Sequence, residues 1–191
     1  GIDYAGHPCD WKALKAIADK FEIILINDNC HAMGSSYKKD KKYALKFADV
    51  VTQSYHPVKH ITTGEGGAIL TNDEKIYKKT LELRNHGMTK DPNQMLDNDG
   101  PWYYEMHDLG FNYRLTDLQS ALGSSQLKKL DDFVLKRREI SRIYNKQFFG
   151  KNIFQTPIEN ELVCSSFHLY PLQIDFSKLK ITKSNFFKKM K

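Results

Sequence analysis

The sequence predicts an α/β fold built on a largely parallel sheet with flanking helices. Short apolar runs alternate with segments of helical periodicity, which is the pattern of strands connected by helices. The chain has 191 residues, of which 40% are apolar and 12% aromatic, so it can bury a hydrophobic core. A glycine at position 150 marks a break. We therefore expect residues 1–150 to form the larger unit and residues 151–191 to begin a small C-terminal domain.

Three apolar segments predict the strands of the larger unit. Residues 22–26 predict a buried strand that ends at Asn27 and Asp28, and residues 49–54 predict the next strand. Residues 67–71 predict a third. In a parallel sheet the carboxyl ends of the strands lie along one edge, and ligands of such sheets bind there. We therefore expect functional side chains just after each of these segments.

Local signals mark the helices between and after these strands. Residues 11–21 repeat apolar side chains at helical spacing behind Asp10, a helix-capping residue, and residues 74–85 predict a second helix. A third helix begins with a capping box formed by Thr116 and Gln119 and continues, with a kink, to position 148. Its apolar side is expected to face inward with Leu118, Leu122, Leu127 and Leu130.

The remaining segments are less regular. Residues 91–100 are polar and contain proline and glycine, which predicts a mobile loop. Beyond Gly150, residues 167–174 predict a strand of the second unit, and residues 183–191 predict the start of a helix.

Lys59 and Asp28 form the most informative pair of residues in the chain. Lys59 ends the run SYHPVK directly after the strand predicted at 49–54, and a glycine turn follows it. Asp28 stands at the end of the preceding strand. A pyridoxal phosphate enzyme needs such a pair, because the lysine amine bonds to the cofactor aldehyde and the acid keeps the pyridine nitrogen protonated. The alternative is an ordinary surface lysine and an aspartate that starts a turn.

Two further side chains fall at the same predicted edge. Ser54 either simply ends its strand or donates its hydroxyl to the cofactor phosphate. His31 follows Asp28 by three residues. It is either a loop histidine or a side chain that lies over the cofactor ring or beside its phenolic oxygen. His56 and His60 flank Lys59, but no other ligand has fitting spacing, so we assign no metal site.

Composition narrows the partners and the compartment. The formal net charge is +6 and the pI is about 9.1. We interpret the surplus of basic residues as solvated helix faces. The alternative is that it attracts an anion such as a nucleotide diphosphate or nucleic acid. Aromatic residues are not interleaved with basic ones as on a base-stacking surface, so we expect no nucleic acid partner. We expect no membrane span and no signal peptide. The three cysteines match neither a disulfide framework nor a metal motif, which favours a cytoplasmic protein.

Several motifs stand in a fixed order over roughly the first 130 residues. They are DYAGHPCD at 3–10, NDNCHAMG at 27–34, SYHPVK at 54–59 with TGEGG at 63–67, RNHGM at 84–88 and LGFNYRLTD at 109–117. This combination resembles the pyridoxal phosphate-dependent nucleotide-sugar aminotransferases of the DegT/StrS type. The segment WYYE at 102–105 and the HPVK form of the lysine loop are most similar to one branch of that family. That branch aminates a UDP-linked 4-keto-6-deoxy sugar on the way to pseudaminic acid.

The resemblance implies a fold-type I aminotransferase that works as a homodimer, with residues 1–150 as part of its pyridoxal phosphate-binding large domain. It assigns the covalent and proton-transfer role to Lys59, the ring-nitrogen acid to Asp28 and the position beside the ring oxygen to His31. Ser54 is assigned to the cofactor phosphate, and Asn112 to the phosphate of the neighbouring subunit's cofactor. The implied substrates are glutamate, as the amino donor, and a sugar nucleotide. A lysine at position 59 argues against a related dehydratase.

The family's proteins are longer than this chain. We therefore expect a partial fold that lacks the earlier segment where a helix N-terminus grips the cofactor phosphate, and we expect the isolated chain to bind the cofactor weakly. Transamination is the first functional hypothesis. The second is a catalytically incomplete fragment that serves as a dimerisation or regulatory module, and the third is nucleic acid binding through the basic C-terminal half.

Overall fold

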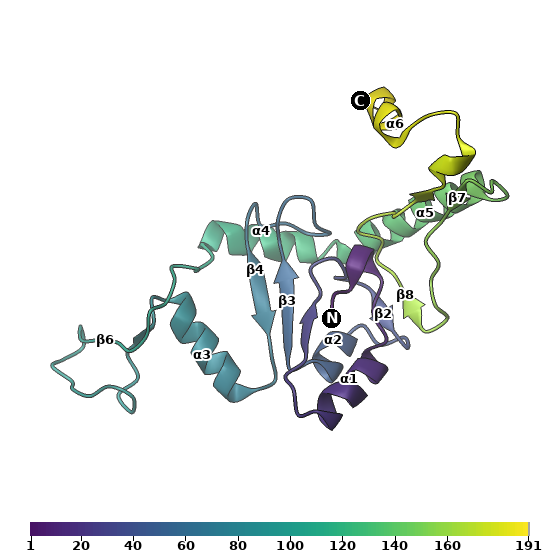
Figure 1. Cartoon of the computed structure of the whole chain (residues 1–191). Helices are drawn as coiled ribbons and strands as arrows, with labels where there is room; N and C mark the ends of the chain where they lie inside the picture. Colours follow the sequence, from purple (N-terminus) through teal and green to yellow (C-terminus); the bar gives the residue numbers. More distant parts are fainter. Residues whose placement is uncertain (191) are drawn as a thin grey trace.

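A three-stranded sheet lies at the centre of the molecule, for which a computed structural model describes residues 1–190. Strand β1 (Ile26–Asp28) pairs in parallel with β3 (Val50–Ser54), and β3 pairs antiparallel with β4 (Gly67–Leu70). Helices surround these strands (Figure 1). The predicted α/β class is therefore confirmed, and the sheet contains one parallel and one antiparallel pair of strands.

Strand β4 runs opposite to the direction that a parallel sheet requires. The loop between β3 and β4 folds back on itself, and the Tyr55 N–H donates to the Gly66 carbonyl at 2.8 Å. This bond continues the antiparallel ladder in which Ser54 faces Gly67. A short loop closed in this way returns the chain beside β3, whereas a parallel neighbour needs a long crossover.

The first strand is shorter than the sequence predicts, because helix α1 (Trp11–Lys20) ends in a Schellman motif. Glu22 has a φ of +53°, and the Ile23 N–H donates to the Ala18 carbonyl at 3.1 Å. The predicted buried strand at 22–26 is therefore wrong for most of its length, and β1 begins only at Ile26. Both isoleucines ahead of it, at positions 23 and 24, are exposed.

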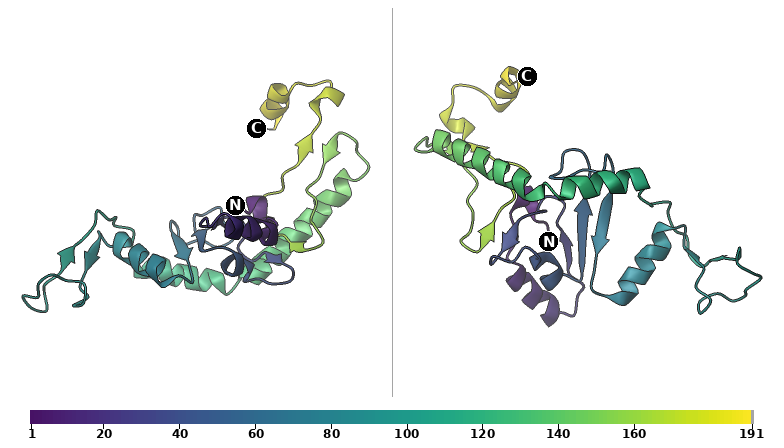
Figure 2. Two further views of the ribbon diagram at one scale, coloured as in Figure 1. Left: turned by 60° about the horizontal axis from the view of Figure 1, so that its bottom comes forward. Right: turned by 180° about the vertical axis from the view of Figure 1, so that it is seen from behind.

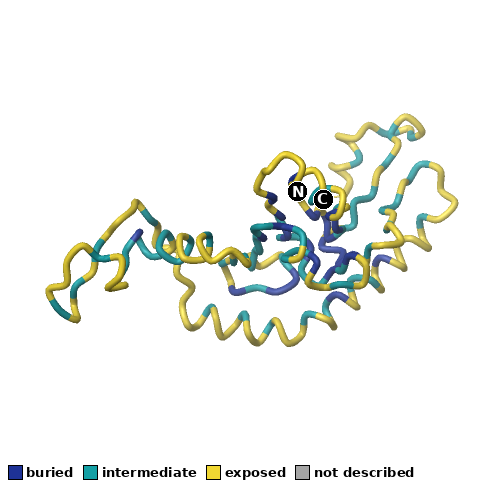
Figure 3. The backbone as a smooth tube through the Cα atoms, turned by 90° about the horizontal axis from the view of Figure 1, so that it is seen from below, coloured by how far each residue is buried: buried dark blue, intermediate teal, exposed yellow. Residues whose placement is uncertain are grey.

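The main core lies where α1 and α2 (Tyr43–Phe47) meet β3. Asp10 caps α1 as predicted, with its carboxylate accepting from the Ala13 N–H at 3.2 Å. The buried core residues are Trp11, Ala18, Leu25, Tyr37, Tyr43, Ala48 and Val51. Figure 3 shows that buried residues concentrate in this central body, while the outer parts of the molecule are mostly exposed or half-buried.

A buried carboxylate joins these elements. Asp3 is 0% exposed, and its oxygens accept hydrogen bonds from five donors. The donors are Cys9 N and Trp11 Nε1, both at 2.8 Å, Asn27 Nδ2 at 3.2 Å, Asn29 Nδ2 at 2.8 Å and the Tyr43 hydroxyl at 2.7 Å. The start of α1, the start of α2 and the end of β1 are therefore fixed to one side chain, which sets the position of the strand that carries Asp28.

Helix α3 (Glu74–Arg84) leads into an arm that extends from the body. The arm carries the short antiparallel pair β5 (Met88–Thr89) and β6 (Glu105–Met106), with the predicted polar loop between them. Figure 1 shows the arm reaching well away from the central sheet.

Helices α4 (Asp117–Leu127) and α5 (Leu130–Phe148) run one after the other: α4 crosses the sheet, and α5 extends beyond it toward the C-terminal residues (Figure 2). The predicted capping box is present: the Thr116 hydroxyl accepts from the Gln119 N–H at 3.3 Å, and the Gln119 side chain accepts from the Thr116 N–H at 3.0 Å. The inward orientation of the α4 leucines is wrong for this chain. Leu118 is 84% exposed, and its neighbours at 122 and 127 are exposed as well. These leucines form no single stripe, because at about 3.6 residues per turn Leu127 lies on the opposite side of α4 from Leu118.

The C-terminal residues form short strands and helices. Strand β2 (Ser36–Tyr37) pairs with β8 (Val163–Cys164), and β7 (Phe154–Gln155) pairs with β9 (Gln173–Ile174). A 3-10 turn (Phe176–Lys178) and α6 (Lys183–Lys189) follow. No helix within residues 1–190 combines the length and apolar character of a membrane span.

The predicted strand at 167–174 is wrong except for its last two residues. Phe167 has a φ of +47°, outside the strand region. Backbone groups that would pair in such a strand are bonded elsewhere. The Leu169 N–H donates to the Ala5 carbonyl at 3.3 Å, and the carbonyls of Phe167 and His168 accept from Arg137 Nη1 at 3.4 Å and 3.2 Å. The division of the chain at residue 150 stays a prediction. A helix does end at Phe148, and Gly150 has a φ of +74°.

Candidate functional site

The two faces of the sheet have different chemistry. Side chains alternate along a strand, so Thr52 and Ser54 share one face of β3, while Val51 and Gln53 share the other. Asp28 pairs in register with Thr52, and its carboxylate lies 3.5 Å from the Thr52 hydroxyl. Asp28, Thr52 and Ser54 therefore belong to one face, at the carboxyl ends of two parallel strands.

Asp28 is held in its ionised form. Its carboxylate accepts from the Cys30 N–H at 3.1 Å, an Asx turn that orients the side chain at the strand end. Hydrogen bonding from the Cys30 side chain, followed by its backbone N–H, keeps the pKa of Asp28 below its ordinary value. A carboxylate that is ionised and half-buried at a strand end is suited to hold a cationic N–H group.

Lys59 lies in the loop between β3 and β4, where its backbone N–H donates to the His56 carbonyl at 2.9 Å. Its side chain is half-buried. The Lys59 ammonium acts on the same groups as Asp28: it lowers the pKa of His31, which the Asp28 charge raises, and both charges also act on Cys30. The charges of the predicted amine and the predicted carboxylate therefore act in opposite directions on the pKa values of the same two side chains.

The glycines after Lys59 serve the packing of their own loop. A Cβ at Gly66 would meet the Thr63 hydroxyl at 2.5 Å, and one at Gly67 would meet the Gln53 carbonyl at 2.6 Å. A Cβ at Gly64 would meet nothing within 4 Å. Close approach of the chain to itself therefore explains Gly66 and Gly67. Close approach to a ligand remains an explanation for Gly64 alone.

Ser54 and His31 both lie at this edge of the sheet. The Ser54 hydroxyl accepts from the His56 N–H at 3.4 Å, so it stands where the Lys59 loop begins. His31 is half-buried, and its Nδ1 accepts from the Ala5 N–H at 3.4 Å. Because Nδ1 is an acceptor there, the neutral ring carries its proton on Nε2. Burial, followed by the charge of Lys59, lowers the pKa of His31 and favours this neutral form.

Sequence reasoning assigned no role to His168, which the structure places against His31 with ring centroids 4.4 Å apart. The ring centroid of His60 lies 5.4 Å from that of His168, so that three histidines gather beside Lys59. Burial and the neighbouring cations lower the pKa of His60 to about 3 and that of His168 to about 4. No signal near position 168 predicts this contact, because it joins segments far apart in the chain.

Asn112 lies apart from the other predicted residues. It is exposed, on the segment between β6 and α4, and it forms a bridge with Asn85 at the end of α3. No hydrogen bond of the described residues joins it to the sheet edge. Its predicted role, toward the cofactor of a second subunit, stays a prediction.

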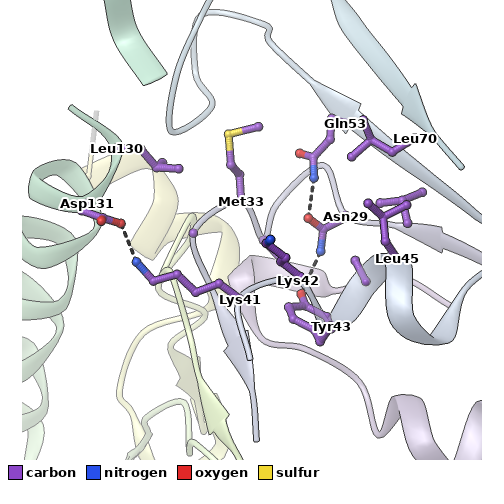
Figure 4. A pocket seen from close by; sticks show the side chains of 14 residues that line it. Asn29, Met33, Lys41, Lys42, Tyr43, Leu45, Gln53, Leu70, Leu130 and Asp131 are labelled. Atoms are coloured by element: carbon purple, nitrogen blue, oxygen red, sulfur yellow. Dashed lines mark hydrogen bonds and ion pairs between the residues drawn. The ribbon is translucent and has the colours of Figure 1, made fainter. Parts of the chain in front are cut away.

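A cavity of about 270 Å³ lies on the opposite face of the sheet, where Val51 and Gln53 point. Figure 4 shows its hydrogen-bonded chain, in which Gln53 Nε2 donates to Asn29 Oδ1 at 2.6 Å and Asn29 Nδ2 donates to the Tyr43 hydroxyl at 2.8 Å. Lys41 pairs with Asp131 at its rim. None of the predicted site residues lines this cavity, so it is separate from the Asp28 edge. No group of histidine, cysteine or acidic residues within 1–190 is arranged to hold a metal ion.

Comparison with known proteins places this geometry in context. The model of the DegT/DnrJ/EryC1/StrS aminotransferase family matches residues 1–191. A UDP-4-amino-4,6-dideoxy-N-acetyl-beta-L-altrosamine transaminase of Campylobacter jejuni is 40% identical over 171 residues, which are 90% of this chain and 43% of the relative. The chain spans about half the length, or slightly less, of the curated relatives that it matches.

Solved structures agree with the sequence match. PseC of Helicobacter pylori, an aminotransferase of pseudaminic acid biosynthesis, superposes with a TM-score of 0.83 at 32% identity, covering 98% of this chain and 49% of PseC. The PLP form of Spr1654, a putative sugar aminotransferase of Streptococcus pneumoniae, gives a TM-score of 0.79 at 28% identity, covering 91% of this chain and 47% of that one. The expected partial fold-type I architecture is confirmed by these superpositions.

Proposed function

Because the chain belongs to the DegT/DnrJ/EryC1/StrS aminotransferase family, we propose that the protein containing it is a pyridoxal phosphate-dependent aminotransferase of sugar nucleotides. The observation that carries the proposal is that Asp28 ends β1 and the Lys59 loop begins at Ser54, the last residue of the neighbouring parallel strand β3, so both lie at one edge of the sheet. Ligands of α/β sheets bind at such an edge.

The residues present fit the cofactor. An ionised Asp28 can accept the pyridinium N–H, and a half-buried Lys59 offers an amine at the same edge. The Ser54 hydroxyl, on the same face as Asp28, would hold the phosphate, and the Nε2–H of His31 would face the ring or its phenolic oxygen. When bound, pyridoxal phosphate withdraws electrons from the carbon that carries the amino group and so makes its proton labile.

Each side chain has a task that its surroundings support. Asp28 would keep the ring nitrogen protonated, because hydrogen bonds from Cys30 favour the charged form of its carboxylate. The Lys59 Nζ atom would hold the cofactor, and the same amine would move a proton at the amino-bearing carbon of the substrate. The loop that carries Lys59 is braced by the Tyr55–Gly66 bond, which limits the positions that the amine can reach.

The finer proposal concerns the substrates. We propose glutamate as the amino donor and a UDP-linked 4-keto-6-deoxy sugar of the pseudaminic acid type as the acceptor. Support comes from the printed functions of the Campylobacter relative and of Helicobacter PseC. The free cysteines at positions 9, 30 and 164 agree with a reducing, cytoplasmic compartment.

We further propose a homodimer in which the arm between α3 and α4 contacts a second copy. The arm and the start of α4 expose a set of large apolar side chains that a monomer would leave in water. They are Trp102, Tyr104, Met106, Leu109, Phe111, Tyr113 and Leu118. Asn112 lies in the middle of this exposed set, which fits its proposed contact with the phosphate of the neighbouring cofactor.

The test uses the complete polypeptide that contains this chain, incubated with pyridoxal phosphate, glutamate and the UDP-4-keto sugar. We expect 2-oxoglutarate and an amino sugar nucleotide in equal amounts, detected by mass spectrometry. Lys59→Ala should abolish turnover, whereas Lys78→Ala, which removes an exposed lysine of α3, should leave it unchanged. Turnover that survives Lys59→Ala would contradict the proposed role of this lysine. A protein that binds the cofactor but transfers no amino group to the 4-keto sugar would contradict the proposed acceptor substrate.

A further inference from the structure

A contact between two histidines closes one side of the candidate site. The ring of His168 lies on that of His31, with centroids 4.4 Å apart and planes at 42°. His168 is 9% exposed and His60, behind it, is 4% exposed. The Nδ1 atoms of both are buried without a hydrogen-bond partner among the described residues. Within the described residues no hydrogen bond reaches the His168 ring, so packing against the other two histidines holds it in place.

The backbone that carries His168 is fixed from two directions. From α5, Arg137 Nη1 donates to the carbonyls of Phe167 at 3.4 Å and of His168 at 3.2 Å. From the N-terminal loop, the Gly6 carbonyl accepts from the Ser166 N–H at 3.1 Å. The fit is tight, because a Cβ on Gly6 would lie 2.7 Å from the Ser166 hydroxyl.

The same N-terminal loop also fixes His31 directly. The Ala5 N–H donates to His31 Nδ1, and the Tyr4 ring lies 5.9 Å from the imidazole. One edge of the His31 ring is therefore held by a backbone donor, and one face is covered by His168. Together these contacts leave Nε2–H as the ring atom that is free to serve the site beside Lys59.

We propose that His168 is a positioning residue for His31: its ring, carried on a backbone that Arg137 holds, keeps the His31 imidazole in one orientation beside Lys59. The proposal rests on the proposed function for what His31 serves there. The contact itself needs only the ring shape, so an aromatic residue at position 168 should preserve it and an aliphatic residue should not.

The first measurement is independent of any cofactor. Carbethoxylation of individual histidines in the complete polypeptide is followed by peptide mass spectrometry at neutral pH, without pyridoxal phosphate. We expect His168→Ala and His168→Leu to raise the rate at His31 by about three- to tenfold, the factor expected for losing one ring–ring contact. His168→Phe should keep the wild-type rate. His107→Ala, on the arm, should change nothing at His31.

The second measurement is the visible absorbance of added pyridoxal phosphate. We expect the alanine and leucine variants to shift the position or pH dependence of the band, and the phenylalanine variant to match the wild type. Equal carbethoxylation rates at His31 in the wild type and the three His168 variants would overturn the proposal. A phenylalanine variant that behaves like the alanine variant would overturn it as well. Should alanine prevent folding, the leucine and phenylalanine variants still decide. A wild type that shows no band contradicts the proposed function but leaves the His31 rates as an independent result.

Discussion

Replacement of Asp3 by alanine should destabilise the protein more than any single change at its surface. Three donors would lose their only described partner: Cys9 N, Trp11 Nε1 and Asn27 Nδ2. Leaving a buried donor unsatisfied costs about 1–3 kcal/mol each. The other two donors, Asn29 and Tyr43, still bond to each other. Since removing a buried carboxylate also removes its desolvation cost, we expect a net loss of about 4 kcal/mol in the free energy of unfolding.

Urea unfolding followed by circular dichroism measures this loss. With a slope of about 2 kcal/mol per molar urea, the midpoint should fall by roughly 2 M. Asp19→Ala is the matched control, because Asp19 is exposed and pairs only with Lys15 one turn away, which is worth about 0.5 kcal/mol or less. A loss below about 1 kcal/mol for Asp3→Ala would refute the view that this carboxylate joins α1, α2 and β1.

Two further predictions concern the packing around the site. Gly6→Ala should cost about 2–4 kcal/mol, because the new methyl group would meet Ser166 while the backbone stays at a φ of +97°. Gly64→Ala, with a similar φ of +82° but open space, should cost only about 1–2 kcal/mol in the same urea assay, and equal costs would contradict the close approach at Gly6. The pKa of His60 is lowered to about 3, mainly by burial, so the unfolded chain binds more protons as the pH falls below about 6.5 and stability decreases. His60→Gln should flatten the dependence of the urea midpoint on pH between 6.5 and 4.5, and an unchanged slope would contradict a neutral buried His60.

Local signals in the sequence predicted local structure well. Asp10 caps α1, and Thr116 and Gln119 form the capping box of α4, because these interactions involve neighbouring residues only. The common edge for Asp28 and Ser54 also follows from the parallel pairing of β1 with β3. Local hydrogen bonding and strand order were enough to bring these residues to one edge.

Features that depend on distant parts of the chain were missed. The direction of β4 depends on how the Lys59 loop closes, and the strand expected at 167–174 is lost because Ala5 and Arg137 bond to its backbone groups. His168 reaches His31 only through this long-range packing. The capping box located the start of α4, but local signals cannot say which surface covers its leucines.

The most direct test of the account is to find which amine bonds to pyridoxal phosphate. The complete polypeptide is incubated with the cofactor, reduced with borohydride, digested and mapped by mass spectrometry. We predict one dominant adduct, on Lys59, which disappears in Lys59→Ala and is much reduced at low cofactor concentration in Asp28→Asn. Adducts spread over surface lysines, or a dominant adduct that persists in Lys59→Ala, would contradict a cofactor site built from this lysine and this aspartate.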